Sequence, residues 1–376
     1  MLLKNNLSSE QIQIELQSNG MLMENIQSGA SGRKGGAGPS DHKAVQLFGS
    51  TIMVPVFNHV SESSPFFASS PNEFGVASLY KNGEKITSIT FPPQPKFYSF
   101  NTSDGIPMWK VAQLHSHNVL ATTVLQNCIR FYDRTDSCQF CAIGDSLKAG
   151  RTIAYKQPHH LAEVAKIAVE QDGVQQFVMT TGTPASSDRG AKILYESVLA
   201  VKAAVAIDIQ VQCEPPDDFS WFQKLKSAGT DALGMHLEAV EEEVRKKIMP
   251  GKAAVTLEYY MEAFTAAVAI FGKGNVSTYL LAGLGDSAKS LREVSEQLIT
   301  IGVYPFIVPF VPIKGTPLEM HGSPSQEFMA SVLEPVAQML LDAKMTSDTL
   351  KAGCAKCGAC STLKSFENKL RKSYAA

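Results

Sequence analysis

The chain has 376 residues, a length that fits one large barrel-type domain with smaller additions at either end. Its 44% hydrophobic and 19% charged residues are ordinary for a globular protein, and its net charge of -2 argues against a nucleic-acid or anionic-membrane partner bound by bulk electrostatics. No apolar run approaches the roughly 20 residues that span a bilayer, and the N-terminus lacks the apolar core of a signal peptide. We therefore expect a cytoplasmic protein that acts on a small molecule.

Residues 1–42 are predicted to form a flexible arm. They show no apolar periodicity and end in the Gly/Ser-rich run SGASGRKGGAGPSD. A phosphate-loop interpretation of these glycines is disfavoured, because no strand precedes them and no Gly-Lys-Ser/Thr follows. Residues 43–120 carry short runs such as TIMVPVF and KITSITF, broken by Pro, Asn and Gly, which predict a small β-rich N-terminal region.

From residue 121 onward, strand-like apolar runs alternate with helical patterns. The runs are ATTVLQN, QQFVMTT, AIDIQVQ, ALGMHLE, VSTYLLAGL and YPFIVPFV. Six strand-helix repeats predict an α/β fold with a parallel sheet, either a partial (β/α)6 TIM-type barrel over residues 121–325 or a doubly wound open sheet. Both place the chemistry at the carboxyl ends of the strands. Residues 326–376 are predicted to form a C-terminal helix and a cysteine-containing extension.

Six of the seven cysteines fall into two tight clusters, which in a reducing compartment indicates metal or redox chemistry rather than disulfides. The first cluster, Cys128, Cys138 and Cys141, follows the first predicted barrel strand. A structural zinc site would need four protein ligands, so three thiolates leave an open position on a zinc ion or an iron-sulfur cluster. Alternatively, Cys128 is a small buried hydrophobic residue and only the other two bind metal.

The loop that ends in Cys138-Gln139-Phe140-Cys141 resembles the cluster-binding loop of the radical S-adenosylmethionine (SAM) superfamily. The usual spacing there is three residues and then two, whereas here it is nine and two, typical of a divergent branch. The resemblance covers residues 115–325. It implies a 4Fe-4S cluster whose open iron binds SAM, reductive cleavage to a 5'-deoxyadenosyl radical, a reductant such as flavodoxin or ferredoxin, and a small metabolite as substrate.

Further positions match the SAM-binding pattern of the superfamily. The resemblance places Phe140 near the adenine, with ordinary loop packing as the alternative. Glu214, in the run VQCEPPDD at the end of the third predicted strand, is a candidate to bind the methionine amino group or a substrate cation. Cys213 is expected to be a buried strand residue, with a distant cluster ligand as the alternative. The other implied contacts lie in TTGT, GMHLEAV and YLLAGLGD, and they are Thr181, Gly182, His236, Glu238, Gly283 and Asp286. The run VPFVPIKGTPLE is similar to the ending of biotin-synthase-like members.

The second cluster lies near the C-terminus, where AGCAKCGACST places Cys354, Cys357 and Cys360 at the spacing C-x2-C-x2-C. This spacing is typical of iron-sulfur sites, and the glycines leave the backbone free to wrap a cube. We expect an auxiliary cluster that relays electrons, binds substrate at an open iron or donates sulfur. A zinc site would again need a fourth ligand, and an unstructured thiol-rich tail is a further alternative.

Two segments resemble the superfamily branch found in bacterial nitrilase gene clusters, which implies small nitrile or nitrogenous substrates. They are PKFYSFNTSDGIPMWKVAQLHSHNVLATTVLQNC and MHLEAVEEEVRKKIMPGKAAVTLEYYMEAF.

Three rival functions stay open. The first is a non-catalytic iron-sulfur electron carrier. The second is a zinc enzyme that uses Cys138 and Cys141 with His115 or His117, and the third is a thiol-nucleophile hydrolase, although nothing pairs a cysteine with a placed histidine and acid.

Overall fold

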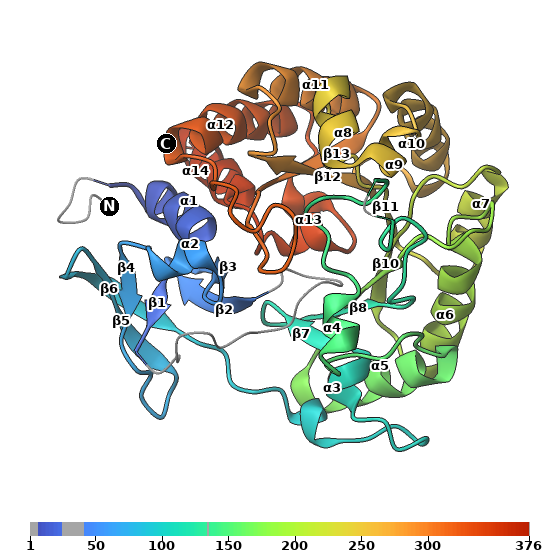
Figure 1. Cartoon of the computed structure of the whole chain (residues 1–376), viewed down its shortest axis with the longest axis horizontal. Helices are drawn as coiled ribbons and strands as arrows, with labels where there is room; N and C mark the ends of the chain where they lie inside the picture. Colours follow the sequence, from blue (N-terminus) through green and yellow to red (C-terminus); the bar gives the residue numbers. More distant parts are fainter. Residues whose placement is uncertain (1–6, 25–40, 134, 376) are drawn as a thin grey trace.

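The computed structural model describes residues 7–24, 41–133 and 135–375, and it contains two β-sheets (Figure 1). The smaller sheet has the strand order β1-β4-β5-β6-β2-β3, and all its neighbours are antiparallel except β1 and β4. Its strands are β1 (Leu22–Met23), β2 (His42–Leu47), β3 (Ser50–Pro55), β4 (Phe66–Ala68), β5 (Val76–Lys81) and β6 (Glu84–Thr90). The runs TIMVPVF and KITSITF overlap β3 and β6, while the domain boundaries given above stay predictions.

Helix α1 (Ser9–Asn19) replaces part of the predicted flexible arm. The Ser8 hydroxyl accepts the N–H of Gln11, whose side chain accepts the Ser8 N–H in return, a capping box that starts the helix. The helix buries apolar and polar residues alike, which hid its period in the sequence; they are Ile12, Gln13, Ile14, Leu16, Gln17 and Ser18. Residues 1–6 and 25–40 of the predicted arm lie outside the described residues.

The larger sheet has the strand order β13-β12-β11-β10-β9-β8-β7. Strands β8 to β13 run parallel, and β7 pairs with β8 in the antiparallel direction at the edge. These strands are β7 (Gln113–His115), β8 (Val119–Thr123), β9 (Gln176–Thr180), β10 (Asp208–Gln212), β11 (Ala232–Gly234), β12 (Val276–Ala282) and β13 (Val303–Pro309). Each predicted strand run of this part of the chain contains or overlaps one of them.

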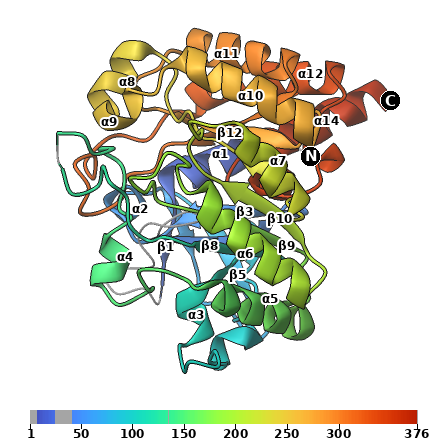
Figure 2. The ribbon, with the colours of Figure 1, turned by 90° about the vertical axis from the view of Figure 1, so that its right-hand side faces the viewer.

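Helices cover the outer face of the larger sheet, as Figure 2 shows for α5, α6, α7, α10, α11 and α12. The helices of this part are α5 (Pro158–Asp172), α6 (Ala191–Ala204), α7 (Ser220–Ser227), α8 (Glu242–Ile248), α9 (Pro250–Ala253), α10 (Leu257–Phe271), α11 (Ala288–Thr300), α12 (Gln326–Asp342) and α14 (Leu363–Ala375). Shorter turns are α2 (His59–Glu62), α3 (Met108–Val111), α4 (Asp145–Lys148), α13 (Cys354–Cys357), η1 (Lys96–Ser99) and η2 (Ser347–Thr349).

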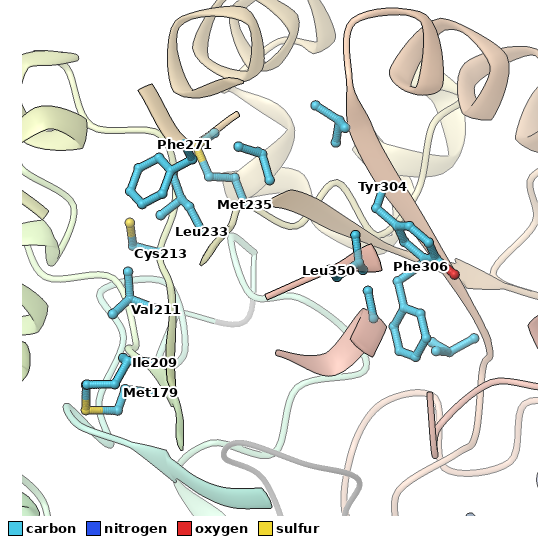
Figure 3. Close-up of a cluster of buried hydrophobic side chains, with 14 of the residues drawn as sticks. Met179, Ile209, Val211, Cys213, Leu233, Met235, Phe271, Tyr304, Phe306 and Leu350 are labelled. Atoms are coloured by element: carbon cyan, nitrogen blue, oxygen red, sulfur yellow. The ribbon is translucent and has the colours of Figure 1, made fainter. Parts of the chain in front are cut away.

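Apolar side chains fill the space between the larger sheet and its helices. Figure 3 shows Met179 of β9, Ile209 and Val211 of β10, and Leu233 of β11, all fully buried. Cys213 is 7% exposed and belongs to the same core, which confirms the prediction for it. Strands buried on both faces are typical of parallel sheets. The α/β class and the parallel sheet are confirmed, while the partial (β/α)6 barrel stays a prediction.

Among the described residues, every helix is too short or too polar to span a lipid bilayer.

Candidate functional site

The loop that carries the first cysteine cluster runs from the end of β8 to α4. Gln139 N–H donates to the C=O of Ile248, at the end of α8, over 2.8 Å. Within the loop, Cys141 N–H donates to Cys138 C=O over 3.0 Å and closes a tight turn. The loop is therefore held by its own turn and by a neighbouring helix.

A cavity of about 390 Å³ lies at the carboxyl ends of the parallel strands. The strand-end residues Thr123, Thr180, Gln212 and Pro309 line it, and so do all three cysteines of the first cluster. Its volume is in the range of small-molecule sites, and its position is the one expected for parallel α/β sheets. Cys128 borders this cavity, so it is not a core hydrophobic residue.

Cys138 and Cys141 are half-buried at the cavity wall. Burial raises the pKa of Cys138 well above its usual range and that of Cys141 to about 12, and the charge of Glu238 adds to both shifts. Such thiols stay protonated at neutral pH unless a metal binds them and displaces the proton. The donor set therefore fits a thiolate-bound metal centre.

The spacing of the sulfur atoms distinguishes between metal centres. In neither cysteine cluster do the three sulfurs all lie within 4.8 Å of one another; within the described residues, the one group of potential ligands that close is Asp104, His159 and His160. A tetrahedral zinc ion, with bonds of roughly 2.3 Å to sulfur, would hold its ligands within roughly 4 Å of one another. An iron-sulfur cube distributes its ligands over separate iron atoms, and the wider spacing favours it.

Most of the residues predicted to contact SAM border the same cavity. They are Phe140, Thr181, Gly182, Glu214, His236 and Glu238. Gly283 and Asp286 are not among the described residues that line it. Gly283 packs against Pro324, and the Asp286 carboxylate accepts the backbone N–H groups of Val240 (3.1 Å) and Glu241 (2.7 Å), which fixes the start of α8.

Glu214 and Arg130 form an ion pair in the cavity wall, with side-chain exposures of 10% and 11%. Arg130 Nη1 donates to Glu214 Oε1, which also accepts from Thr183 Oγ1 over 3.0 Å. The other carboxylate oxygen, Oε2, is buried and has no hydrogen-bond partner among the described residues. A buried acceptor without a hydrogen-bond partner reduces the stability of the folded state. Here the free oxygen could accept hydrogen bonds from an ammonium group of a ligand. Sequence reasoning identified Glu214 but missed Arg130, which lies in the loop between Cys128 and Cys138.

Glu238 and Lys252 form a second ion pair, in which Lys252 Nζ lies 2.8 Å from Glu238 Oε2. Glu238 has a φ of 67°, which is uncommon for a residue other than glycine. Its N–H donates to Tyr279 C=O over 2.8 Å and its C=O accepts from Leu281 N–H over 2.7 Å, so β12 holds this conformation. Lys252 was missed because the surrounding run MPGKAAV carries no motif signal.

His236 is half-buried at the cavity wall, next to the ring of Tyr279. The backbone N–H of Tyr279 donates to His236 Nδ1 over 3.2 Å, which requires an unprotonated Nδ1. Burial, with a contribution from the charge of Lys252, lowers the pKa of His236 to about 3. The imidazole is therefore neutral at physiological pH.

Because His236 is neutral in the folded state, we expect the protein to lose stability in acid. Its pKa is about 3 in the folded state and about 6.5 in the unfolded state, so between these values only the unfolded state gains the proton. The free energy of unfolding should fall as the pH drops through this window, by at most about 1.4 kcal/mol per pH unit from this residue. Urea unfolding of wild type and His236→Gln at several pH values measures the slope, and equal slopes would contradict the prediction.

A second prediction concerns Gly182, which packs against the backbone of the cysteine loop. A Cβ atom there would lie 1.9 Å from the carbonyl oxygen of Asn127, the residue before Cys128. Gly182→Ala must displace this backbone, so we expect a loss of about 1–3 kcal/mol of stability and weaker retention of iron. Gly322→Ala is the matched control, because its Cβ meets nothing within 4 Å. Thermal unfolding and iron analysis compare the two variants. If both have the same unfolding temperature and iron content, the cysteine loop accommodates the extra methyl group without cost.

The second cysteine cluster reaches the same cavity, since Cys354 and Cys360 line it. Gln212 Nε2 donates to Cys354 Sγ over 3.3 Å, and His115 Nε2 lies 3.4 Å from Cys360 Sγ. Burial raises the pKa of Cys354 to about 11. Two clusters that are far apart in the sequence thus share one cavity.

The segment that bears this cluster is fixed between the two sheets. Gly353 N–H donates to Gln176 Oε1 over 2.9 Å, at the start of β9. The C=O of Ala359 accepts Met53 N–H of β3 over 2.8 Å and Gln17 Nε2 of α1 over 3.0 Å. The segment continues into α14, so the alternative of an unstructured tail is wrong for its described residues.

The zinc-enzyme alternative is disfavoured by the positions of the two histidines. His115 lies against Cys360, and His117 Nδ1 lies 3.4 Å from Thr51 Oγ1. Neither histidine lines the cavity next to Cys138 and Cys141.

Comparisons with known proteins agree with this geometry. A family model of the radical SAM superfamily matches residues 135–298. The bacteriochlorophyllide c C-7(1)-hydroxylase of Chlorobaculum limnaeum is 30% identical over 226 residues, 54% of this chain and 56% of that protein. An uncharacterised protein of Methanocaldococcus jannaschii is 26% identical over 227 residues, 57% of this chain and 56% of that protein. The chain thus spans little more than half the length of these curated relatives.

Among solved structures, methylornithine synthase is similar with a TM-score of 0.43 and 19% identity, over 57% of this chain and 60% of that one. The family match and the curated hydroxylase thus show that part of this chain, including residues 135–298, is similar to the radical SAM superfamily.

Proposed function

We propose that this chain holds a 4Fe-4S cluster on Cys128, Cys138 and Cys141 and uses it to cleave SAM and act on a small metabolite. The observation that carries the proposal is the shared cavity, in which the three thiols face an unpaired carboxylate oxygen of Glu214 and the anchored carboxylate of Glu238. When bound, the cluster and SAM supply a 5'-deoxyadenosyl radical that abstracts hydrogen from the substrate.

In this proposal the chain's own residues bind and orient SAM. Glu214 Oε2 accepts the methionine ammonium group, while Arg130 holds the other carboxylate oxygen and fixes the orientation. Glu238 accepts the ribose hydroxyls, with Lys252 holding its carboxylate in place. Phe140, which packs beside Cys138 in a small apolar cluster, contacts the adenine.

Other residues complete the cofactor site in more passive roles. Thr181 and Gly182 provide the wall after β9, and the neutral His236 offers its Nε2–H to a ribose oxygen. Asp286 and Gly283, which do not line the cavity, support it indirectly: Asp286 fixes the start of α8, and Gly283 allows the close approach of Pro324.

The second cysteine cluster is proposed to hold an auxiliary iron-sulfur cluster on Cys354, Cys357 and Cys360. Its position at the same cavity supports a role in the same reaction.

A cavity of about 390 Å³ that must also hold SAM favours a small substrate. The resemblance to the nitrilase-cluster branch supports a nitrile or other small nitrogen compound, with flavodoxin or ferredoxin as reductant in the cytoplasm.

Anaerobic reconstitution with iron and sulfide tests the proposal. Two 4Fe-4S clusters correspond to about eight irons per chain, and addition of reductant and SAM should yield 5'-deoxyadenosine. Iron without SAM cleavage would favour an electron carrier instead, and zinc in place of iron would refute both.

A further inference from the structure

The second cysteine cluster has three thiols, and a neighbouring histidine supplies a fourth donor. His115 ends β7, and its Nε2 lies 3.4 Å from Cys360 Sγ although the two residues are 245 positions apart. The His115 side chain is 6% exposed, and within the described residues its ring has no other hydrogen-bond partner. A buried imidazole directed at a cysteine cluster is a candidate ligand rather than a surface group.

The turn after β7 holds this histidine against the cluster. Ser116 adopts a φ of 62°, which is uncommon for a residue other than glycine and redirects the chain immediately after His115. The Ser116 hydroxyl is within hydrogen-bonding reach of Cys357. Consecutive residues of one turn therefore contact two of the three cysteines, and the pairing of His115 with Val119 in β8 ties this turn to the parallel sheet.

Four donors of the Cys3His type fit either a zinc ion or an iron-sulfur cluster. His115 Nε2 and Cys360 Sγ, 3.4 Å apart, must separate if they bind two different irons of a cluster. The spacing of the whole set nevertheless disfavours a single zinc ion. No three of the four donor atoms lie within 4.8 Å of one another in the described structure, whereas zinc bonds of roughly 2.0–2.3 Å require all four to be that close. Gln212 donates to Cys354 Sγ over 3.3 Å, and hydrogen bonds to cluster sulfurs are one of the means by which proteins set reduction potentials.

We propose that His115 is the fourth ligand of the auxiliary cluster, which leaves that cluster without an open iron for substrate. This inference rests on the proposed auxiliary cluster at Cys354, Cys357 and Cys360. Substrate would then lie in the shared cavity without a bond to the second cluster, and hydrogen abstraction would depend on its position relative to SAM alone.

The test isolates the auxiliary cluster in the full-length chain by changing Cys128, Cys138 and Cys141 to alanine. After anaerobic reconstitution, this variant should retain about four irons. Pulsed EPR of the reduced protein should show a strongly coupled nitrogen, and the coupling should change to that of 15N when the histidines are 15N-labelled. His115→Ala should lose the coupling, while His115→Cys should lose it and keep the iron. His117→Ala, in the same turn, is the control and should change neither.

The outcomes distinguish the proposed auxiliary cluster from the proposed role of His115 as its fourth ligand. Absence of iron, or zinc in its place, would overturn the auxiliary cluster and the ligand with it. Iron with no nitrogen coupling, with a coupling only as weak as that of an N–H···S hydrogen bond, or with a coupling that survives in His115→Ala would overturn the ligand alone. If His115→Ala does not fold, His115→Cys still decides, because a thiolate in this position preserves the donor count but removes the nitrogen.

Discussion

Replacing Cys138 with alanine is expected to abolish 5'-deoxyadenosine formation and to remove about four irons per chain. Cys138 lies in the turn that Cys141 N–H closes, its half-buried side chain lines the cavity, and Gln139 anchors the turn to α8. Two remaining thiolates cannot hold a cube that leaves one iron open for SAM. Iron analysis and chromatographic detection of 5'-deoxyadenosine after anaerobic reduction measure both effects.

The matched control for this variant is Cys213→Ala. Cys213 also borders the cavity, is 7% exposed and lies outside both cysteine clusters. Its replacement removes a thiol that is more buried than that of Cys138 but belongs to neither cluster, so iron and SAM cleavage should stay at wild-type values apart from a small loss of stability. Equal loss of activity in the two variants would mean that Cys138 acts through packing, and full activity of Cys138→Ala would exclude it as a cluster ligand.

Replacing Lys252 with methionine is expected to cost about 3–5 kcal/mol of unfolding free energy, the usual cost of leaving one partner of a buried ion pair uncompensated. The side chains of Lys252 and Glu238 are 8% and 17% exposed. Burial alone would lower the pKa of Lys252, but the charge of Glu238 raises it above its ordinary value. A raised lysine pKa stabilises the folded state at every pH below the unfolded value of about 10.4, so the effect is fully present at neutral pH.

Denaturant unfolding of the apo protein measures this loss. The double variant Lys252→Met with Glu238→Leu should recover much of the stability, because no charge is then left buried. Lys246→Met is the control, since Lys246 pairs with Glu242 over 2.6 Å at exposures of 57% and 78%, and exposed pairs contribute at most about 1 kcal/mol. Similar losses in Lys252→Met and Lys246→Met would contradict a special cost of burial.

The parallel sheet and the position of the first cysteine cluster could be predicted from the sequence because both depend on local pattern. The run YPFIVPFV is continuously apolar, and all seven residues of β13 are buried. A cysteine loop directly after a predicted strand must lie at the carboxyl edge of a parallel sheet, where the cavity is found. Helix α1 was missed because glutamines interrupt its apolar face and are buried along with it.

Contacts between distant elements could not be predicted, because periodicity carries no information on which side chains face one another across the fold. Arg130 and Glu214 are 84 positions apart, and nothing in either run indicates the pairing. Pro250, at the first position of α9, separates that helix from α8, and Thr256 caps the start of α10. Asp286 matched a family motif, yet its carboxylate binds the backbone of Glu241.

The contact of Ala359 with Gln17 and Met53 has a consequence for biosynthesis. Gln17 and Ala359 are 342 positions apart, and ribosomes deliver the chain from its N-terminus onward. The small sheet can form early, but the main-chain donor of Met53 and the amide of Gln17 find their acceptor only after the parallel strands have been made. The segment that bears the second cysteine cluster can therefore reach its position between the two sheets only after nearly the whole chain has been synthesised.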